Sequence, residues 1–138
     1  MKIKQISIFL ENSAGRIAEV TNTLKEAGIN LRAIMIADTA DFGILRIITN
    51  DSEKTIKVLQ EANFTTRTTD VLAVKIPDKV GSLHEVMVLF QKNNINIEYL
   101  YASFEVTEDS TVIIFKVENP DDGLKVLDKN GYSTISSF

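Results

Sequence analysis

The chain has 138 residues, of which 44% are hydrophobic and 25% charged, a composition typical of a globular protein with a buried core. It has no cysteine and one histidine, which excludes disulfides, thiolate metal sites and cysteine nucleophiles and argues against a histidine-based zinc site, so neither metal nor cofactor is expected. Fifteen basic and nineteen acidic residues give a net charge of -4 without a local Lys/Arg stripe, so nucleic acid is not an expected partner.

The N-terminal residues enter an alternating pattern directly, with no apolar segment of a signal peptide. No apolar run approaches the roughly 18 residues that a membrane span needs. We therefore expect a cytoplasmic protein without a membrane segment.

Hydrophobic periodicity predicts the elements in chain order. Apolar and other residues alternate over 6–10, which is typical of a strand, and apolar residues then recur at spacings of three and four, which is typical of a helix. Gly28 ends this helix, since glycine and asparagine most easily adopt the left-handed conformation. The predicted elements that follow are strands over 29–37 and 42–49, a helix from Asp51 to Asn63, and a short strand from about Thr65.

The same order of elements then repeats. Residues 15–20 and 81–86 share a Gly-x-x-x-Glu-Val pattern, and residues 28–31 match 94–97 at the same offset of 66. Gly28 and Asn94 differ in side chain, but both residue types readily adopt the left-handed backbone conformation that ends a helix.

The later part of the repeat is offset by 68 residues, because Lys57-Val-Leu59 recurs as Lys125-Val-Leu127. The two extra residues fall in a predicted hairpin, 107–110 in the second copy against 39–41 in the first. Asn119 followed by Pro120 and two aspartates predicts the start of the last helix.

The resulting order is βαββαβ, twice. We predict an α+β fold of two tandem ferredoxin-like modules, each an antiparallel sheet with helices on one face. The predicted domains are residues 1–70 and 71–138. Residues 44–48 and 112–115 are apolar on both strand faces, so we expect the second sheet face to be covered, by the other repeat or by a second chain in a homodimer.

The sequence resembles tandem ACT domains, the small-ligand sensing modules that are attached to enzymes of amino-acid metabolism or work beside them. Each copy has an acidic or amide residue after its first strand, a glycine three positions later, a helix, and a Gly-Ile-Asn-like entry to the second strand. These residues are Asn12 with Gly15 and residues 28–30, then Asp78 with Gly81 and residues 94–96. Ala14 and Val80 stand where the family often has proline. The resemblance implies an amino acid or similar metabolite bound at an interface between modules.

An amino acid needs donors for its carboxylate and acceptors for its ammonium group. The glycine of each loop permits a tight turn, and the unpaired N–H groups at the helix start can hold a carboxylate. Asn12 or Asp78 can accept from the ammonium group, and the charge of Asp78 predicts two unequal pockets. The candidate ligand-binding residues are Asn12, Ser13, Ala14, Gly15, Arg16, Asn30, Asp78, Val80, Gly81, Ser82 and Asn96, and no residue is assigned a catalytic or metal-binding role.

Purely structural roles could also explain the presence of these residues. A glycine and a capping residue are common wherever a strand turns into a helix, and asparagine is common at turns such as Asn30 and Asn96. His84 is better explained as an edge residue, and Arg46 as an exposed strand position. Tyr99 and Tyr101 are better explained by packing on a sheet face than by a pocket.

The leading functional hypothesis is a regulatory sensor without activity of its own. The main alternative is a regulatory subunit of an amino-acid biosynthetic enzyme, which would require an enzyme partner. An acylphosphatase-like enzyme is a further alternative, faintly suggested by Ala14-Gly-Arg16, and an RNA-binding domain of βαββαβ order is disfavoured by the acidic charge.

Overall fold

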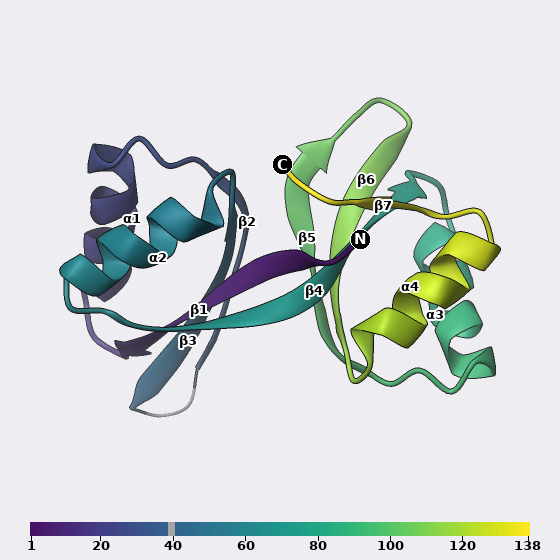
Figure 1. Cartoon of the computed structure of the whole chain (residues 1–138), viewed down its shortest axis with the longest axis horizontal. Coiled ribbons are helices and arrows are strands. Elements are labelled where there is room, and N and C mark those ends of the chain that lie inside the picture. The colour runs from purple at the N-terminus through teal and green to yellow at the C-terminus, as the bar shows by residue number, and fades with distance from the viewer. Residues whose placement is uncertain (39–40) are drawn as a thin grey trace. The chain divides into compact units, whose positions relative to one another are not determined.

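The computed structural model describes residues 1–38 and 41–138, in which helices and strands follow the order βαββαβαββαβ (Figure 1). The chain divides into two compact units. The first unit is Lys4–Thr69, and the second unit is Asp70–Phe138 together with Met1–Ile3. One strand, β4 (Thr65–Pro77), passes from the first unit into the second without interruption.

The first unit places its strands in the order β4-β1-β3-β2, with β1 and β2 each antiparallel to β3. Ile47 of β3 faces Ile6 of β1 on one side and Ile34 of β2 on the other. The remaining elements of this unit are β1 (Ile3–Glu11), α1 (Arg16–Glu26), β2 (Leu31–Asp38), β3 (Phe42–Thr49) and α2 (Ser52–Glu61).

The second unit repeats this arrangement with the order β7-β4-β6-β5, in which β6 is antiparallel to both β4 and β5. Its elements besides β4 are α3 (Ser82–Lys92), β5 (Ile97–Val106), β6 (Ser110–Val117), α4 (Pro120–Lys129) and β7 (Ser133–Ile135). In each unit the two helices lie together against one sheet face (Figure 1). The predicted α+β class, with helices on antiparallel strands, is confirmed.

Each unit has its own hydrophobic core between the helices and the sheet. The core of the first unit includes Leu24 of α1 and Ile47 of β3, and the matching positions in the second unit are Phe90 of α3 and Phe115 of β6. The two phenylalanine rings pack edge to face with their centroids 5.5 Å apart. The repeats therefore keep the same core positions and fill them with side chains of different size.

The sheet face opposite the helices is also poorly accessible to water, as the apolar pattern predicts. The strand register places Ala33 beside Ile48 in the first unit and Ala73 beside Ile114 in the second, on the faces away from both cores. All four side chains are buried. Both faces of these strands are buried, which explains why both carry apolar side chains.

All four helices end as the Gly/Asn exchange predicts. The residues with positive φ at these ends are Gly28 (70°), Asn63 (65°), Asn94 (55°) and Gly131 (78°). After α1, for example, the amide of Ile29 donates to the carbonyl of Leu24 over 2.9 Å, which satisfies a carbonyl that the helix leaves without a partner.

Replacing Gly28 by alanine should lower the free energy of unfolding by about 1–2 kcal/mol, because a side chain strains the left-handed backbone. The cost is backbone strain alone, since a Cβ at this position would meet no atom within 4 Å. Gly28→Asn should cost less, because Asn94 adopts the same conformation in the second unit. Urea unfolding of both variants checks this, and equal losses would contradict the conformational explanation.

The hairpin that joins β5 to β6 is closed by a hydrogen bond of 2.7 Å between the hydroxyls of Thr107 and Ser110. The predicted two-residue difference from the first hairpin falls partly on positions 39 and 40, which lie outside the described residues. None of the helices in residues 1–38 and 41–138 has the length and apolar character needed to cross a membrane.

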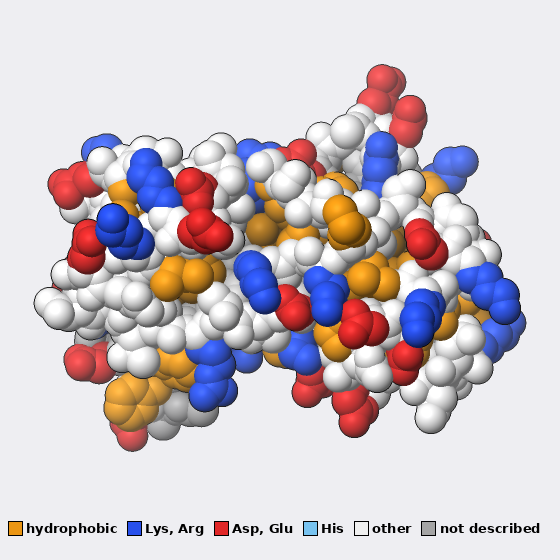
Figure 2. All heavy atoms as spheres, viewed as in Figure 1, with side chains coloured by type: hydrophobic (Ala, Val, Ile, Leu, Met, Phe, Trp, Pro, Cys, Tyr) orange, Lys and Arg blue, Asp and Glu red, His pale blue; other side chains and the backbone are white. Residues whose placement is uncertain are grey.

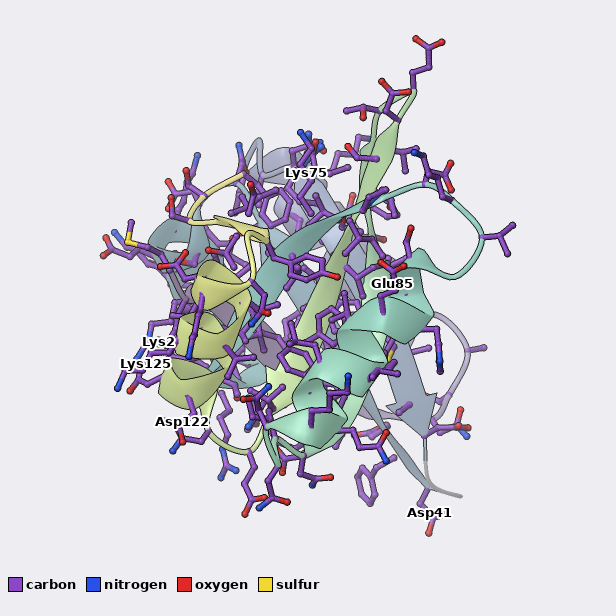
Figure 3. The ribbon with its side chains drawn as sticks, turned by 90° about the vertical axis from the view of Figure 1, so that its right-hand side faces the viewer. Lys2, Asp41, Lys75, Glu85, Asp122 and Lys125 are labelled. Carbon is purple, nitrogen blue, oxygen red and sulfur yellow. The ribbon has the colours of Figure 1, made fainter. Side chains whose placement is uncertain are left out.

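The first residues of the chain are tied to the second unit by polar contacts. The Lys2 ammonium lies 3.0 Å from a carboxylate oxygen of Asp121 and 3.8 Å from one of Asp70. The hydrogen bond and charge of Asp121 raise the pKa of Lys2 above its usual value. Figure 3 labels Lys2 and also Asp122, the residue that follows Asp121 in the chain.

Candidate functional site

The loop that joins β1 to α1 carries most of the predicted ligand-binding residues of the first unit. The amide of Ser13 donates to the carbonyl of Glu11 over 2.9 Å, and the amide of Arg16 donates to the carbonyl of Ser13 over 3.4 Å. Gly15 precedes the helix with a φ of 87°, a conformation that strains any residue with a side chain. The loop is therefore a tight turn that depends on glycine.

The loop between β4 and α3 has the same backbone pattern. The amide of Ser82 donates to the carbonyl of Lys79 over 3.2 Å, and Gly81 also has a φ of 87°. The repeat in the sequence is thus a repeat of loop geometry.

The helices after these two loops begin differently from α2 and α4. Asp51 and Asn119 cap α2 and α4 by accepting from backbone amides, as predicted for Asn119, whereas no side chain caps α1 or α3. The capping explanation of Asn12 and Asp78 is therefore wrong. Capping needs a side-chain oxygen at the residue before the helix, and glycine occupies that place in both loops.

The amides at these helix starts are not all available to a ligand, which corrects one expectation. Those of Arg16 and Ser82 donate within the loop. The amides of Ala14 and Gly15 have no acceptor among the described residues. Because the first turn of a helix favours negative charge, these two amides are donors suited to a carboxylate.

The first loop borders a hollow of about 270 Å³. Asn12 and Ser13 contribute loop atoms to it, and Ile17 and Ile36 provide exposed apolar walls. The remaining lining residues are Leu10, Glu11, Asp38 and Gly43. Among the described residues, the charged side chains that line it are the carboxylates of Glu11 and Asp38.

Gly43 preserves the depth of this hollow. A Cβ at Gly43 would lie 3.4 Å from Cδ1 of Ile36, so a larger residue would press against the apolar wall. The sequence analysis missed Glu11, Ile36, Asp38 and Gly43. The strand register brings them together, because Glu11 faces Phe42, and Gly43 faces both Leu10 and Asp38.

The loop of the second unit borders a hollow with a different lining. A hollow of about 540 Å³ borders it through Pro77 and Lys79, together with Lys75 and Asp109. The predicted residues Asp78, Val80, Gly81 and Ser82 are absent from its lining. The two loops therefore share a backbone but have different surroundings.

Asn30 and Asn96 lie at the wrong end of their units to share a ligand with their own loops. Leu31 pairs with Thr49 and Asp38 with Gly43, so β2 separates Asn30 from the first loop by roughly 20 Å. The amide of Asn30 instead donates to Oδ1 of Asn50 over 3.1 Å. Asn30 therefore cannot contact a ligand that is held by the loop of its own module.

In the second unit, Asn96 lines a polar hollow of about 320 Å³. Its carbonyl accepts from the amide of Glu118 over 3.0 Å. Ile97 pairs with Val117, whereas Pro77 at the loop end pairs with Ser110, so Asn96 lies at the opposite end of the sheet from its loop.

Arg16 is directed to partners within the first unit. Its Nη1 bonds to the carboxylate of Glu19, and its guanidinium carbon lies 5.2 Å from the centroid of the Phe64 ring. Arg16 is not among the residues that line the hollow of the first loop. Because its guanidinium group already contacts Glu19 and Phe64, Arg16 is poorly placed to bind a phosphate. This argues against acylphosphatase chemistry.

The other singled-out residues have different surroundings. Arg46 is half-buried and pairs with Ser7 and Met35 on the neighbouring strands, on the sheet face away from the core. His84 borders a separate hollow beside α3. Among residues 1–38 and 41–138, no group of histidine and acidic residues is arranged to hold a metal ion.

Comparisons with known proteins identify the family. A family model described as an ACT domain pair matches residues 1–137. A Bacteroides thetaiotaomicron protein of known crystal structure is 36% identical, with a TM-score of 0.92, over 98% of this chain and 92% of that chain. The chain therefore belongs to the ACT domain pair family, a family of regulatory domains.

More distant structures share the fold. The regulatory subunit of aspartate kinase from Thermus thermophilus is 16% identical, with a TM-score of 0.64, over 93% of this chain and 92% of that chain. The corresponding subunit from Thermus flavus is 17% identical, with a TM-score of 0.62, over 91% and 90%. No curated protein matches the chain.

Proposed function

We propose that the chain is a stand-alone regulatory sensor that binds an amino acid or a similar small metabolite and has no catalytic activity of its own. Its two ferredoxin-like ACT modules are residues 1–70 and 71–138. Membership of a regulatory family supports this reading. The observation that carries it is the loop of the first unit, where Asn12 and Ser13 border a hollow lined by carboxylates and apolar walls. The next two residues, Ala14 and Gly15, have amides without an acceptor among the described residues.

The polar groups of this loop match the two charges of an amino acid. The amides of Ala14 and Gly15, at the positive end of α1, bind the carboxylate. Asp38 accepts from the ammonium group, with Glu11 on the same rim. Ile17 and Ile36 enclose a short apolar side chain.

The separation of Asn12 from Asn30 supports a site between modules. If both asparagines contact the ligand, the loop must come from one module and the strand entry from another, since each unit holds them at opposite ends of its sheet. A homodimer supplies such a pair of modules by symmetry. Binding would then stabilise the dimer.

A regulatory subunit of an amino-acid biosynthetic enzyme is the second candidate. Two aspartate kinase regulatory subunits share the fold over more than 90% of this chain, which favours it. Co-purification of an enzyme subunit in stoichiometric amount would support this candidate, whereas purification of the chain alone from its native cells would support the sensor.

Thermal unfolding with each of the twenty amino acids tests the proposed function. A ligand at 100 times its dissociation constant stabilises the folded state by about 2.7 kcal/mol, so one amino acid or a few related ones should raise the Tm. Asp38→Asn and Asn12→Ala should abolish the increase in Tm that arises from binding at the loop of the first unit.

Asp78→Ala is the matched control, because Asp78 does not line the hollow of the first loop and this variant should keep the response. A Tm that no amino acid changes would contradict the sensor function. The proposed site would be contradicted if Asp38→Asn left the responses to all twenty amino acids unchanged.

A further inference from the structure

The first unit contains a guanidinium site that its own chain fills. The guanidinium carbon of Arg16 lies 5.2 Å from the centroid of the Phe64 ring, and Nη1 bonds to the carboxylate of Glu19 on the same turn of α1. A planar cation is thus held by an aromatic face and a carboxylate. Both contacts favour a guanidinium group.

The second unit keeps the ring and the carboxylate but lacks the arginine. Tyr132 stands at the position of Phe64 and Glu85 at that of Glu19, whereas Ser82 replaces Arg16. Ser82 is buried, and its side chain is too short to extend over the ring. Glu85 lies on the first turn of α3 (Figure 3) and makes no ion pair with another described residue.

A hollow of about 400 Å³ is bordered by both Glu85 and Tyr132. Val88 and Leu89 add apolar surface from the next turn of α3, and Lys92 lies at the far end. Tyr132 packs on the core of the second unit and also borders this hollow. On the face drawn in Figure 2, apolar side chains lie among charged side chains of both signs.

We propose that this hollow binds the guanidinium group of a small molecule, in the place that Arg16 occupies in the first unit. The guanidinium stacks on Tyr132 and donates to Glu85, which gives a charge-assisted hydrogen bond together with a cation–π contact. Lys92 is seven residues after Glu85, roughly 10 Å along the helix axis, and its ammonium binds a carboxylate at the other end of the ligand. Free arginine carries both groups.

This site is separate from the loop of the first unit and does not depend on the proposed function. Its lining shares no residue with the hollow at Asn12 and Asp38. Asp38→Asn should therefore leave the affinity for arginine unchanged, so that the two proposals can fail independently.

Isothermal titration of the full chain with arginine, agmatine and citrulline tests the site. Arginine should bind saturably, and citrulline, which has nearly the same shape without the charge, should bind at least tenfold more weakly. Glu85→Gln should weaken arginine binding at least tenfold. Glu19→Gln, the same change at the matching position of the first unit, is the control and should leave it unchanged.

Ser82→Arg tests the same idea by restoring the arginine of the first unit. The new side chain should occupy the hollow and reduce arginine binding at least tenfold without any change to Glu85. A melting curve shows whether this variant is folded, and Glu85→Gln provides the test if it is not. Arginine binding that survives Glu85→Gln, or citrulline binding of equal strength, would overturn the proposal.

Agmatine, which lacks the carboxylate, identifies the source of the guanidinium group. Lys92→Gln should weaken arginine binding severalfold and leave agmatine binding unchanged, which assigns the free amino acid as the ligand. An equal effect on both would overturn the role of Lys92.

Discussion

Phe90→Ala should lower the free energy of unfolding by about 3–5 kcal/mol, the largest loss that we expect from a single change in this chain. Phe90 is fully buried between α3 and the sheet, and its ring packs on Phe115 at an interplanar angle of 81°. The truncation removes the free energy of burying the ring and leaves a cavity that the neighbouring strand cannot close. Urea unfolding followed by circular dichroism measures the loss.

Phe90→Leu is the matched control, because Leu24 occupies the same position in the first unit. It should cost about 1–2 kcal/mol, since most of the apolar volume remains. Amide hydrogen exchange should show faster opening in α3 and β6 of Phe90→Ala than in α1 and β3. A loss below about 1.5 kcal/mol for Phe90→Ala would mean that this core is not packed as described.

Thr55→Val should lower the free energy of unfolding by about 1–3 kcal/mol, because it leaves a buried hydroxyl without its partner. Thr55 is fully buried; its hydroxyl lies 2.8 Å from that of Thr49 and donates to the carbonyl of Asp51 over 2.6 Å. Valine has nearly the same shape, so the loss reports the hydrogen bonds rather than the volume.

The double variant Thr49→Val/Thr55→Val should lose less than the sum of the two single variants. Replacing both partners of a buried hydrogen bond by apolar groups leaves neither unsatisfied. The second unit has Val117 and Gly123 at these positions, and a Cβ at Gly123 would lie 2.8 Å from Cδ1 of Leu72. Additive losses in the double-mutant cycle would contradict the coupling.

Much of the fold follows from local patterns in the sequence. The apolar periods of two and about 3.6 residues located the strands and helices of both copies, because each element must bury one face. The exchange of Gly28 for Asn94 predicted a left-handed backbone at both positions, and both have positive φ. These features depend on residues close to one another in the chain.

The candidate site was only partly predictable. The loops with Gly15 and Gly81 were located correctly, and Asn12 and Ser13 border a hollow. Asp38 and Gly43 come from other strands, and nothing local in the sequence marks them as neighbours of Asn12. The strand pairing decides this, and it also removes Asn30 to the opposite end of the sheet.

The sequence by itself determined the repeat, the order of elements and the backbone of the two loops, because these depend on spacing and on local conformational preference. The tertiary structure alone decided which side chains surround each loop and where Arg16 is directed. The contact of Arg16 with Phe64, and the hollow that Glu85 and Tyr132 both border, require the register and packing of the folded chain. Two copies with the same local pattern therefore present different sites.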